Sequence, residues 1–298
     1  MLHSPVLLEE SIDFLITNTS GKYIDATFGR GGHSRKILES ISKDGNLLAL
    51  DKDLEAIKYA KKNFKDSNFS IKHSGFEDLD LINIPKKVDG IIFDFGLCST
   101  HYDNPSRGFS FKEAGPLDMR IDHRQPNKLA DLFETIDAST LADIIFQYGE
   151  EKESRKISKE ILNSFKNGEI NNTVDLAEII KKTKTQRPKR IHPATKTFQA
   201  LRIFLNDEIN NLKIGLEKSK DLIKTGGRIV CISFHSLEDR AVKQLFAPKK
   251  ISYPKEVPLN NEVIREFRVV AKKIKPKSSE LKSNKRSRSA IMRVFEKI

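Results

Sequence analysis

The sequence predicts an α/β fold in which a Rossmann-like parallel sheet is interrupted by an all-helical domain. Three observations predict it. Short apolar runs typical of buried strands alternate with helical patterns in the first third of the chain, a strand pattern returns after residue 226, and the stretch 105–204 shows helical patterns with no convincing strand. We therefore expect a sheet domain made of residues 1–104 and 205–298, with a helical insertion at 105–204.

The first segment of the sheet domain is expected to hold one helix and then four parallel strands. Ser4 is a suitable N-cap and Pro5 a suitable first residue for a helix at 5–16. Strands separated by helical patterns argue for a parallel sheet with helices on both faces, connected by right-handed crossovers. We expect strands at 22–27, 46–51, 69–73 and 88–94, and intervening helices at 33–41 and 54–64.

The remaining elements follow from the same periodicities. Helical patterns fill the insertion at 129–133, 141–148, 154–165 and 176–182. A long helix at 205–224 leads back to a strand at 226–234. A last strand at 290–295 is expected at the edge of the sheet, after a lysine-rich loop at 272–288.

Composition limits the class of protein. The 298 residues, 38% of them hydrophobic, suffice for the core of a soluble globular protein. A net charge of +12 without a basic amphipathic helix or a long apolar span favours nucleic acid over a membrane as partner. Two isolated cysteines, Cys98 and Cys231, indicate a reducing compartment, and Glu9, Glu10 and Asp13 interrupt what would be the apolar region of a secretory signal. We expect a cytoplasmic protein, and the scattered histidines predict no metal site.

A glycine-rich turn follows the first expected strand. Y-I-D-A-T-F-G-R-G-G-H runs from Tyr23 to His33, and Asp51 ends the second strand. Such glycines let backbone N–H groups and a helix dipole meet a ligand, while Asp51 is placed to accept hydrogen bonds from ribose hydroxyls. Ser34 occupies the third small position of the dinucleotide fingerprint, so that match is partial. The D-x-T-x-G-x-G spacing from Asp25 fits an S-adenosylmethionine site better, with threonine where that pattern more often has its first glycine.

The segment after the fourth expected strand is the candidate for chemistry, because ligands of open α/β sheets bind beyond the carboxyl ends of the strands. It reads D-F-G-L-C-S-T-H-Y-D from Asp94 to Asp103. Asp94 is expected to contact the methionine part of the cofactor and lie near the methyl acceptor; a capping or loop carboxylate is the alternative. Phe95 or Tyr102 could supply a stacking face for an extruded base, or could be plain core residues.

Further motifs give the chain a family resemblance. They are R-G-F-S-F at 107–111, G-P-L-D-M-R-I-D at 115–122, H-P-A-T-K-T-F-Q-A-L-R at 192–202 and S-F-H-S-L-E-D-R at 233–240. Together with H-S-P-V-L-L-E-E near the start and R-S-A-I-M-R-V near the end, they cover nearly the whole chain and are highly specific in combination. The chain resembles the bacterial small-subunit ribosomal RNA methyltransferases that methylate N4 of a cytidine near the decoding centre.

The resemblance implies an S-adenosylmethionine-dependent enzyme whose partner is ribosomal RNA or the small ribosomal subunit, with no membrane partner. It places the cofactor contacts on Gly31, Gly32, His33, Asp51, Phe76, Asp94 and His101. The family more commonly has glutamine at the position of His101, within a loop that reads D-L-G-V-S-S-P-Q-L-D. A histidine can make one hydrogen bond there but cannot reproduce both ends of an amide. The oligomeric state stays open.

The implied reaction moves a methyl group from a sulfonium to the exocyclic amine of cytosine. The enzyme must align the amine with the S–CH₃ bond and accept its proton. Asp94, through its carboxylate or the backbone after it, is the expected catalytic group. The rival chemistry is methylation at C5 by a thiolate of Cys98. A nicotinamide-dependent oxidoreductase and a non-catalytic RNA-binding scaffold are the alternatives from other classes.

Several other residues have an open role at this point. Basic stretches at 181–192 and 272–288 are expected to meet RNA phosphates, or else to form a solvated surface. Five charged residues of the family motifs are expected near the crevice, with ion pairing or helix capping as the alternative: Asp118, Arg120, His235, Glu238 and Asp239.

Overall fold

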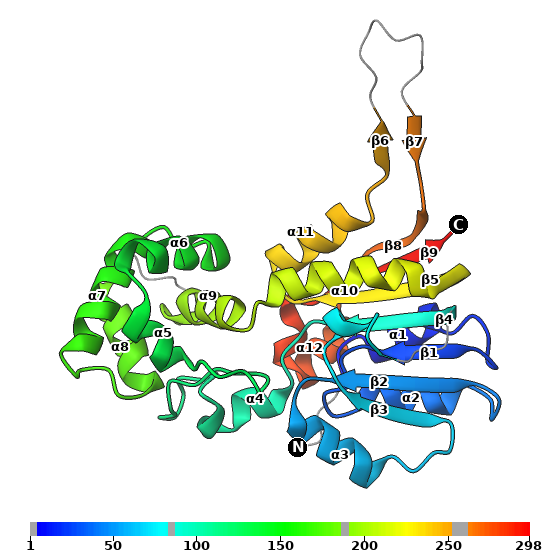
Figure 1. Cartoon of the computed structure of the whole chain (residues 1–298), viewed down its shortest axis with the longest axis horizontal. Coiled ribbons are helices and arrows are strands. Elements are labelled where there is room, and N and C mark those ends of the chain that lie inside the picture. The colour runs from blue at the N-terminus through cyan, green and yellow to red at the C-terminus, as the bar shows by residue number, and fades with distance from the viewer. Residues whose placement is uncertain (1–4, 83–86, 186–190, 252–261) are drawn as a thin grey trace, which may run out of the picture. The chain divides into compact units, whose positions relative to one another are not determined.

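The computed structural model describes residues 5–82, 87–185, 191–251 and 262–298. The chain divides into two compact units (Figure 1). Residues 1–96 and 209–298 form the first, called the sheet unit here, and residues 97–208 form the second, called the helical unit. The boundaries therefore fall at 96/97 and 208/209, where the sequence suggested 104/105 and 204/205.

The sheet unit is built on a seven-stranded sheet of order β3-β2-β1-β4-β5-β9-β8. Strands β1 to β5 run parallel to one another. Strand β9 pairs antiparallel with β5 on one side and with β8 on the other. Continuous apolar runs form the central strands, as expected when both faces of a sheet are covered. The strands are β1 (Lys22–Asp25), β2 (Asn46–Asp51), β3 (Phe69–His73), β4 (Val88–Asp94), β5 (Ile223–Ser233), β8 (Phe267–Ile274) and β9 (Ile291–Lys297).

Alternate residues of each strand face opposite sides, so two cores form. On one side Ile91 and Phe93 pack with Leu212 and Leu216. On the other side Ile92 packs in a cluster that includes residues of the first two helices. Helices α10 (Glu208–Leu222) and α11 (Ser236–Leu245) thus cover one face, and α1 (Leu8–Leu15), α2 (Gly32–Ser40) and α3 (Leu54–Asn63) cover the other.

The predicted start of the first helix, at residue 5, is wrong. Helix α1 begins at Leu8, and its N-cap, Leu7, has left-handed backbone with φ +53°. Tertiary contacts override the local signal: the Val6 carbonyl oxygen lies 3.1 Å from His33 Nε2, and the Leu7 amide donates to Glu280 Oε1 at 3.1 Å. These bonds hold the residues before Leu8 outside the helix. Ser4, the expected N-cap, lies outside the described residues.

The C-terminal part of the sheet also differs from the prediction. Strand β9 lies between β5 and β8, so the edge belongs to β8, a strand that the sequence patterns did not indicate. The expected loop at 272–288 instead contains the end of β8, helix α12 (Ser278–Ser283) and a 3₁₀ turn at Lys285–Ser289. Another antiparallel pair, β6 (Lys249–Ile251) with β7 (Glu262–Ile264), forms a separate two-stranded ribbon (Figure 1).

The helical unit contains no strand in its described residues, 97–185 and 191–208. Apolar pairs four residues apart, such as Leu141 and Ile145 or Ile157 and Ile161, point into one shared core. Its helices are α4 (Ser99–Asp103), α5 (Leu129–Thr135), α6 (Ala138–Gly149), α7 (Ser154–Lys166), α8 (Thr173–Thr183) and α9 (Thr195–Leu205). No helix among the described residues is long and apolar enough to cross a bilayer.

Candidate active site

Three aspartates lie where neighbouring parallel strands end. Asp25 is the last residue of β1, Asp51 of β2 and Asp94 of β4. Strand β1 pairs with both β2 and β4, so the carboxyl ends of all three strands meet at one edge of the sheet. A concentration of carboxylates at the ligand-binding edge of an α/β sheet favours a ligand that carries positive charge.

The turn between β1 and α2 needs glycine for two reasons. Gly31 has φ +73°, a backbone region that L side chains rarely adopt. A Cβ at this position would lie 2.4 Å from Phe64 Cζ and 2.6 Å from Phe28 Cζ. The next residue, Gly32, begins α2, so the turn delivers the backbone N–H groups of that helix to the edge where the aspartates lie.

Backbone amides fix the carboxylate of Asp51. Its Oδ2 accepts from the Gly29 amide at 2.7 Å, and its Oδ1 accepts from the Asp53 amide at 2.8 Å. The first bond ties the glycine turn to the end of β2. Each carboxylate oxygen can accept more than one hydrogen bond, so this arrangement is compatible with ribose hydroxyls as further donors.

Asp94 is held at the end of β4 by its neighbours. Its backbone amide donates to Thr27 Oγ1 at 2.8 Å, and its Oδ1 accepts from the Gly96 amide at 3.2 Å. Burial, with smaller contributions from the charges of Asp25 and Glu238, raises the pKa of Asp94 to about 7. A carboxyl group with this pKa can take up or release a proton near neutral pH.

His33 lies against the same carboxyl group. Its Nδ1 is 3.8 Å from Asp94 Oδ2, and its Nε2 is 3.1 Å from the Val6 carbonyl oxygen. Because a carbonyl oxygen can only accept, Nε2 carries the hydrogen and, in a neutral ring, Nδ1 presents its lone pair toward Asp94.

Ser34, which breaks the dinucleotide fingerprint, has a defined role in the structure. Its hydroxyl donates to Asp25 Oδ2 at 2.6 Å, while the Thr27 amide donates to Asp25 Oδ1 at 3.1 Å. Burial, together with the nearby charge of Asp51, raises the pKa of Asp25 to about 6 in spite of these bonds. The sequence patterns included Asp25, Thr27 and Ser34 but did not indicate these hydrogen bonds, by which the three residues support the edge.

Phe76 begins the 3₁₀ turn Phe76–Asp78 that follows β3. Its ring packs edge-on against Phe93 at 5.8 Å and Phe95 at 6.0 Å between centroids. The Phe95 ring in turn stacks on Phe93 at 5.7 Å between centroids, so Phe95 packs against the core and is partly buried. The sheet unit thus brings six of the seven predicted cofactor residues to its carboxyl edge: Gly31, Gly32, His33, Asp51, Phe76 and Asp94.

The seventh predicted residue, His101, belongs to the helical unit. It is buried in α4, and its ring lies 5.3 Å from that of Phe109. Its contact with the cofactor therefore stays a prediction. Cys98 precedes the same helix, is partly buried and accepts a hydrogen bond from Thr100 Oγ1 at 3.3 Å.

The charged residues of the family motifs make ion pairs and caps. Asp118 forms a two-pronged pair with Arg120, with N–O distances of 2.8 and 2.9 Å. Asp239 does the same with Arg293 at 2.6 and 3.1 Å. His235 caps α11 in a reciprocal arrangement with Glu238. These contacts support the structural alternative for all five residues, because each takes part in an ion pair or in the cap of a helix.

The glycine turn, the order of the parallel strands and the acidic edge define the class: this is a Rossmann-like, S-adenosylmethionine-dependent methyltransferase. The family model described as "MraW methylase family" matches residues 1–298. The chain belongs to this family. Membership favours the methyltransferase class over the nicotinamide-dependent oxidoreductase and the non-catalytic scaffold.

Curated relatives match the chain from end to end. It is 45% identical over 304 residues to the ribosomal RNA small subunit methyltransferase H of Legionella pneumophila strain Paris, with 99% of each chain covered. It is 46% identical over 308 residues to the protein of that name from Francisella philomiragia, covering 100% of this chain and 99% of the relative. The protein of the same name from Caldicellulosiruptor bescii is 44% identical over 305 residues, again with 99% of each chain covered.

Proposed function

We propose that this protein transfers a methyl group from S-adenosylmethionine to the exocyclic N4 of a cytidine in small-subunit ribosomal RNA. The observation that carries the proposal is the partly buried carboxyl group of Asp94, which ends β4 beside the glycine turn and has a pKa raised to about 7. The names of the full-length relatives support the RNA substrate. The resemblance of the motifs supports cytidine N4 as the acceptor.

The residues of the turn and of β2 would hold the cofactor. Backbone groups at Gly31, Gly32 and His33 would meet its carboxylate or polar atoms, and Asp51 would accept from its ribose hydroxyls. When bound, the cofactor supplies an electrophilic methyl group on a sulfonium. Gly31 must be glycine because a Cβ there would collide with Phe28 and Phe64, and this tight turn before α2 supports a role of its backbone groups in holding the cofactor.

Asp94 would act on the acceptor side. Fixing the amine in line with the S–CH₃ bond accounts for roughly 7–11 kcal/mol of barrier reduction in well-oriented reactions. The deprotonated carboxylate would then accept the proton that the amine loses as the new N–C bond forms. His33, whose Nδ1 lies 3.8 Å from Asp94 Oδ2, would help to position Asp94.

RNA phosphates would meet the C-terminal part of the sheet unit. Residues 209–298 contain 22 lysines and arginines but only 9 aspartates and glutamates. The net positive charge of this segment is therefore larger than that of the whole chain, +12. Exposed side chains such as Lys285 and Arg288 lie in the predicted basic stretch 272–288. Such groups bind phosphates through charge and counterion release.

The other predicted basic stretch, 181–192, is supported less well. Its residues 186–190 lie outside the described residues, among them Lys189 and Arg190. Lys181 pairs with Glu178 at 2.8 Å, and Lys184 is buried in an ion pair with Glu151. Lys184 is therefore committed to the interior of the helical unit and not to a phosphate.

The function is tested by nucleoside analysis of ribosomal RNA from cells that lack the protein. We expect the loss of N4-methylated cytidine and its return when the wild-type gene, but not one encoding Asp94→Asn, is restored. The loss of a C5-methylated cytidine instead would overturn the proposal in favour of the Cys98 chemistry.

A further inference from the structure

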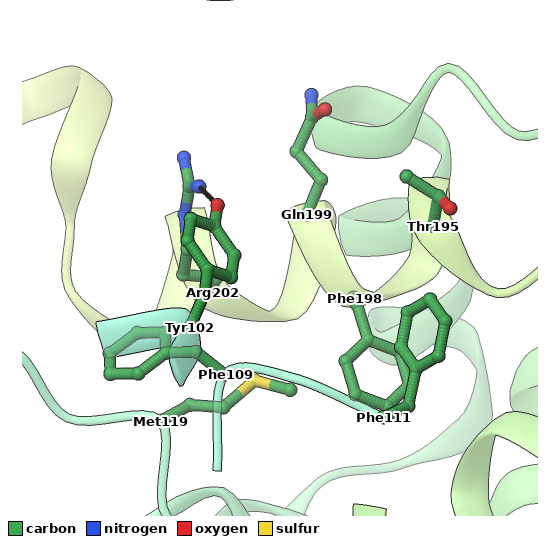
Figure 2. Close-up of a pocket in the computed structure, with 8 residues that line it drawn as sticks. All are labelled: Tyr102, Phe109, Phe111, Met119, Thr195, Phe198, Gln199 and Arg202. Atoms are coloured by element: carbon green, nitrogen blue, oxygen red, sulfur yellow. Dashed lines mark hydrogen bonds between the residues drawn. The ribbon is translucent and has the colours of Figure 1, made fainter. Parts of the chain in front are cut away.

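The helical unit contains a cavity of about 130 Å³ between α9 and the chain that follows α4 (Figure 2). Four lining residues come from α9 at spacings of three and four, so they share one face of that helix. They are Thr195, Phe198, Gln199 and Arg202. The other four are Tyr102, which belongs to α4, and Phe109, Phe111 and Met119 from the irregular segment after it.

Aromatic rings form the walls of this cavity. Figure 2 shows Tyr102 and Phe109 on one side, Phe111 and Phe198 on the other, and Met119 between them. The Phe111 ring packs edge-on against Phe198 with 4.8 Å between centroids. The walls are therefore flat, apolar and held by their own contacts, which suits a planar ligand.

Tyr102 is held in place by an arginine. Arg202 Nη1 donates to the Tyr102 hydroxyl at 3.0 Å, and the same guanidinium binds both carboxylate oxygens of Glu208 at 2.8 Å. The carboxylate balances the charge of Arg202 and fixes its plane. Arg202 is thus a positioning residue for the Tyr102 ring.

The cavity also has polar atoms that the described part of the protein leaves available. Gln199 Nε2 donates to the Tyr148 carbonyl oxygen at 3.3 Å, which orients the amide. Among the described residues, Gln199 Oε1 and the Thr195 hydroxyl have no hydrogen-bond partner. An acceptor and a hydroxyl beside flat rings match the combination of a π-face and a polar edge that a nucleobase presents.

We propose that this cavity binds one unstacked nucleobase of the RNA, with the base against Tyr102 or Phe111 and its edge toward Gln199. The inference rests on the proposed function, which identifies the ligand as RNA. The helical unit has 18 lysines and arginines against 17 aspartates and glutamates, so it adds almost no net charge for phosphate binding. Its contribution to RNA affinity comes from stacking and edge contacts.

The test compares Tyr102→Leu with Tyr102→Phe in the full chain. The probes are labelled single-stranded RNAs of about twelve nucleotides and a sugar–phosphate strand of equal length without bases, titrated by fluorescence anisotropy. We expect Tyr102→Leu to weaken binding of the base-bearing strand by about tenfold and Tyr102→Phe to retain most of it, because stacking needs the ring. The base-free strand should bind wild type and variants alike, and the salt slope should stay the same.

A second variant covers the case in which Tyr102→Leu does not fold. Gln199→Ala should change the order of affinities among oligo(A), oligo(C) and oligo(U), since the amide reads the edge of the base. The inference is wrong if both folded variants bind base-bearing RNA as wild type does, or if the loss is equal for the base-free strand. Binding of S-adenosylmethionine, measured by calorimetry, reports on the proposed function separately and should not change in either variant.

Discussion

The two units of this protein handle polarity in opposite ways. The sheet unit has 35 lysines and arginines against 24 aspartates and glutamates, and it places three carboxyl groups at one edge of its sheet. The helical unit has nearly balanced charge, 18 against 17, and contains a cavity with aromatic walls. On the proposals above, the sheet unit would attract the polyanion and carry out methyl transfer, whereas the helical unit would supply selective contacts for a base.

The largest expected effect comes from Asp94→Asn in the sheet unit. The amide keeps the shape of the side chain but cannot accept a proton, so we expect methyl transfer to fall about 10²- to 10⁴-fold. The wild-type rate should rise with pH through about 7, as the carboxyl group becomes a carboxylate. Rates measured from pH 6 to 8 should show this rise for wild type and a flat profile for the variant.

The same substitution should change stability in the opposite direction. The folded-state pKa of Asp94 is raised, so its contribution to stability is present at low pH and is lost as the pH rises through about 7. Asp94→Asn should therefore be more stable than wild type at pH 8, and the gap should close as the pH falls toward 4. A wild-type rate that does not vary from pH 6 to 8 would argue against Asp94 as proton acceptor.

Next in size is Gly31→Ala, for which the chain offers a matched control. Both Gly31 and Gly226 have left-handed backbone, φ +73° and +79°, but only at Gly31 would a Cβ meet side chains. We expect Gly31→Ala to lower the free energy of unfolding by about 2–5 kcal/mol and to weaken S-adenosylmethionine binding, because strain and overpacking add. Gly226→Ala should cost about 1 kcal/mol and leave cofactor binding unchanged. Urea unfolding measures the stability of the two variants, and calorimetry measures their S-adenosylmethionine binding. Equal losses of stability and of binding in both variants would contradict the proposal that the turn at Gly31 holds the cofactor.

A smaller effect is expected from basic surface residues. Replacing Lys285 and Arg288 with alanine should reduce the salt slope of RNA binding by about 1–2 units, because two phosphate contacts are lost. Replacing Lys156 and Lys159, exposed on α7 of the helical unit, should leave the slope as it is. A larger change of the salt slope for Lys156 and Lys159 than for Lys285 and Arg288 would indicate that RNA phosphates meet the helical unit and not the sheet unit.

The smallest effect is expected for Cys98→Ser. Serine keeps the size of the side chain and its hydrogen bonding with Thr100, so most of the methyl-transfer activity should remain. Complete loss of activity, together with a covalent RNA adduct trapped by the wild-type protein, would favour attack of the thiolate on cytosine C6.

The sequence predicted the bounds of three strands correctly. The apolar residues of β2 and β4 indicated strands inside a parallel sheet. Strand β3, at the edge of the sheet, was indicated by the alternation of apolar and polar residues in F-S-I-K-H. Strand β8 escaped notice because it is an edge strand, with exposed Lys272 and Lys273, and its pattern resembles that of a loop. The start of α1 was missed because contacts with His33 and Glu280, remote in sequence, decide it.

The residues proposed to hold the cofactor could be predicted from the sequence, but the residues that support them could not. Glycine spacing and strand-ending aspartates indicated Gly31, Asp51 and Asp94, since local sequence fixes their place on the sheet. The hydrogen bonds of Ser34 to Asp25 depend on the packing of α2 on β1, which spacing alone does not reveal. For the same reason the aromatic cavity, assembled from two distant segments, could not be located beforehand.

The most direct test of the central claim is a calorimetric titration of S-adenosylmethionine into wild type and Asp51→Asn, with Asp66→Asn, at an exposed ion pair with Arg35, as control. Hydrogen bonds to a carboxylate are worth about 1.5–3 kcal/mol, so binding should weaken by about tenfold or more in Asp51→Asn and stay the same in Asp66→Asn. Equal affinity in all three proteins would show that the acidic edge of the sheet unit does not hold the methyl donor.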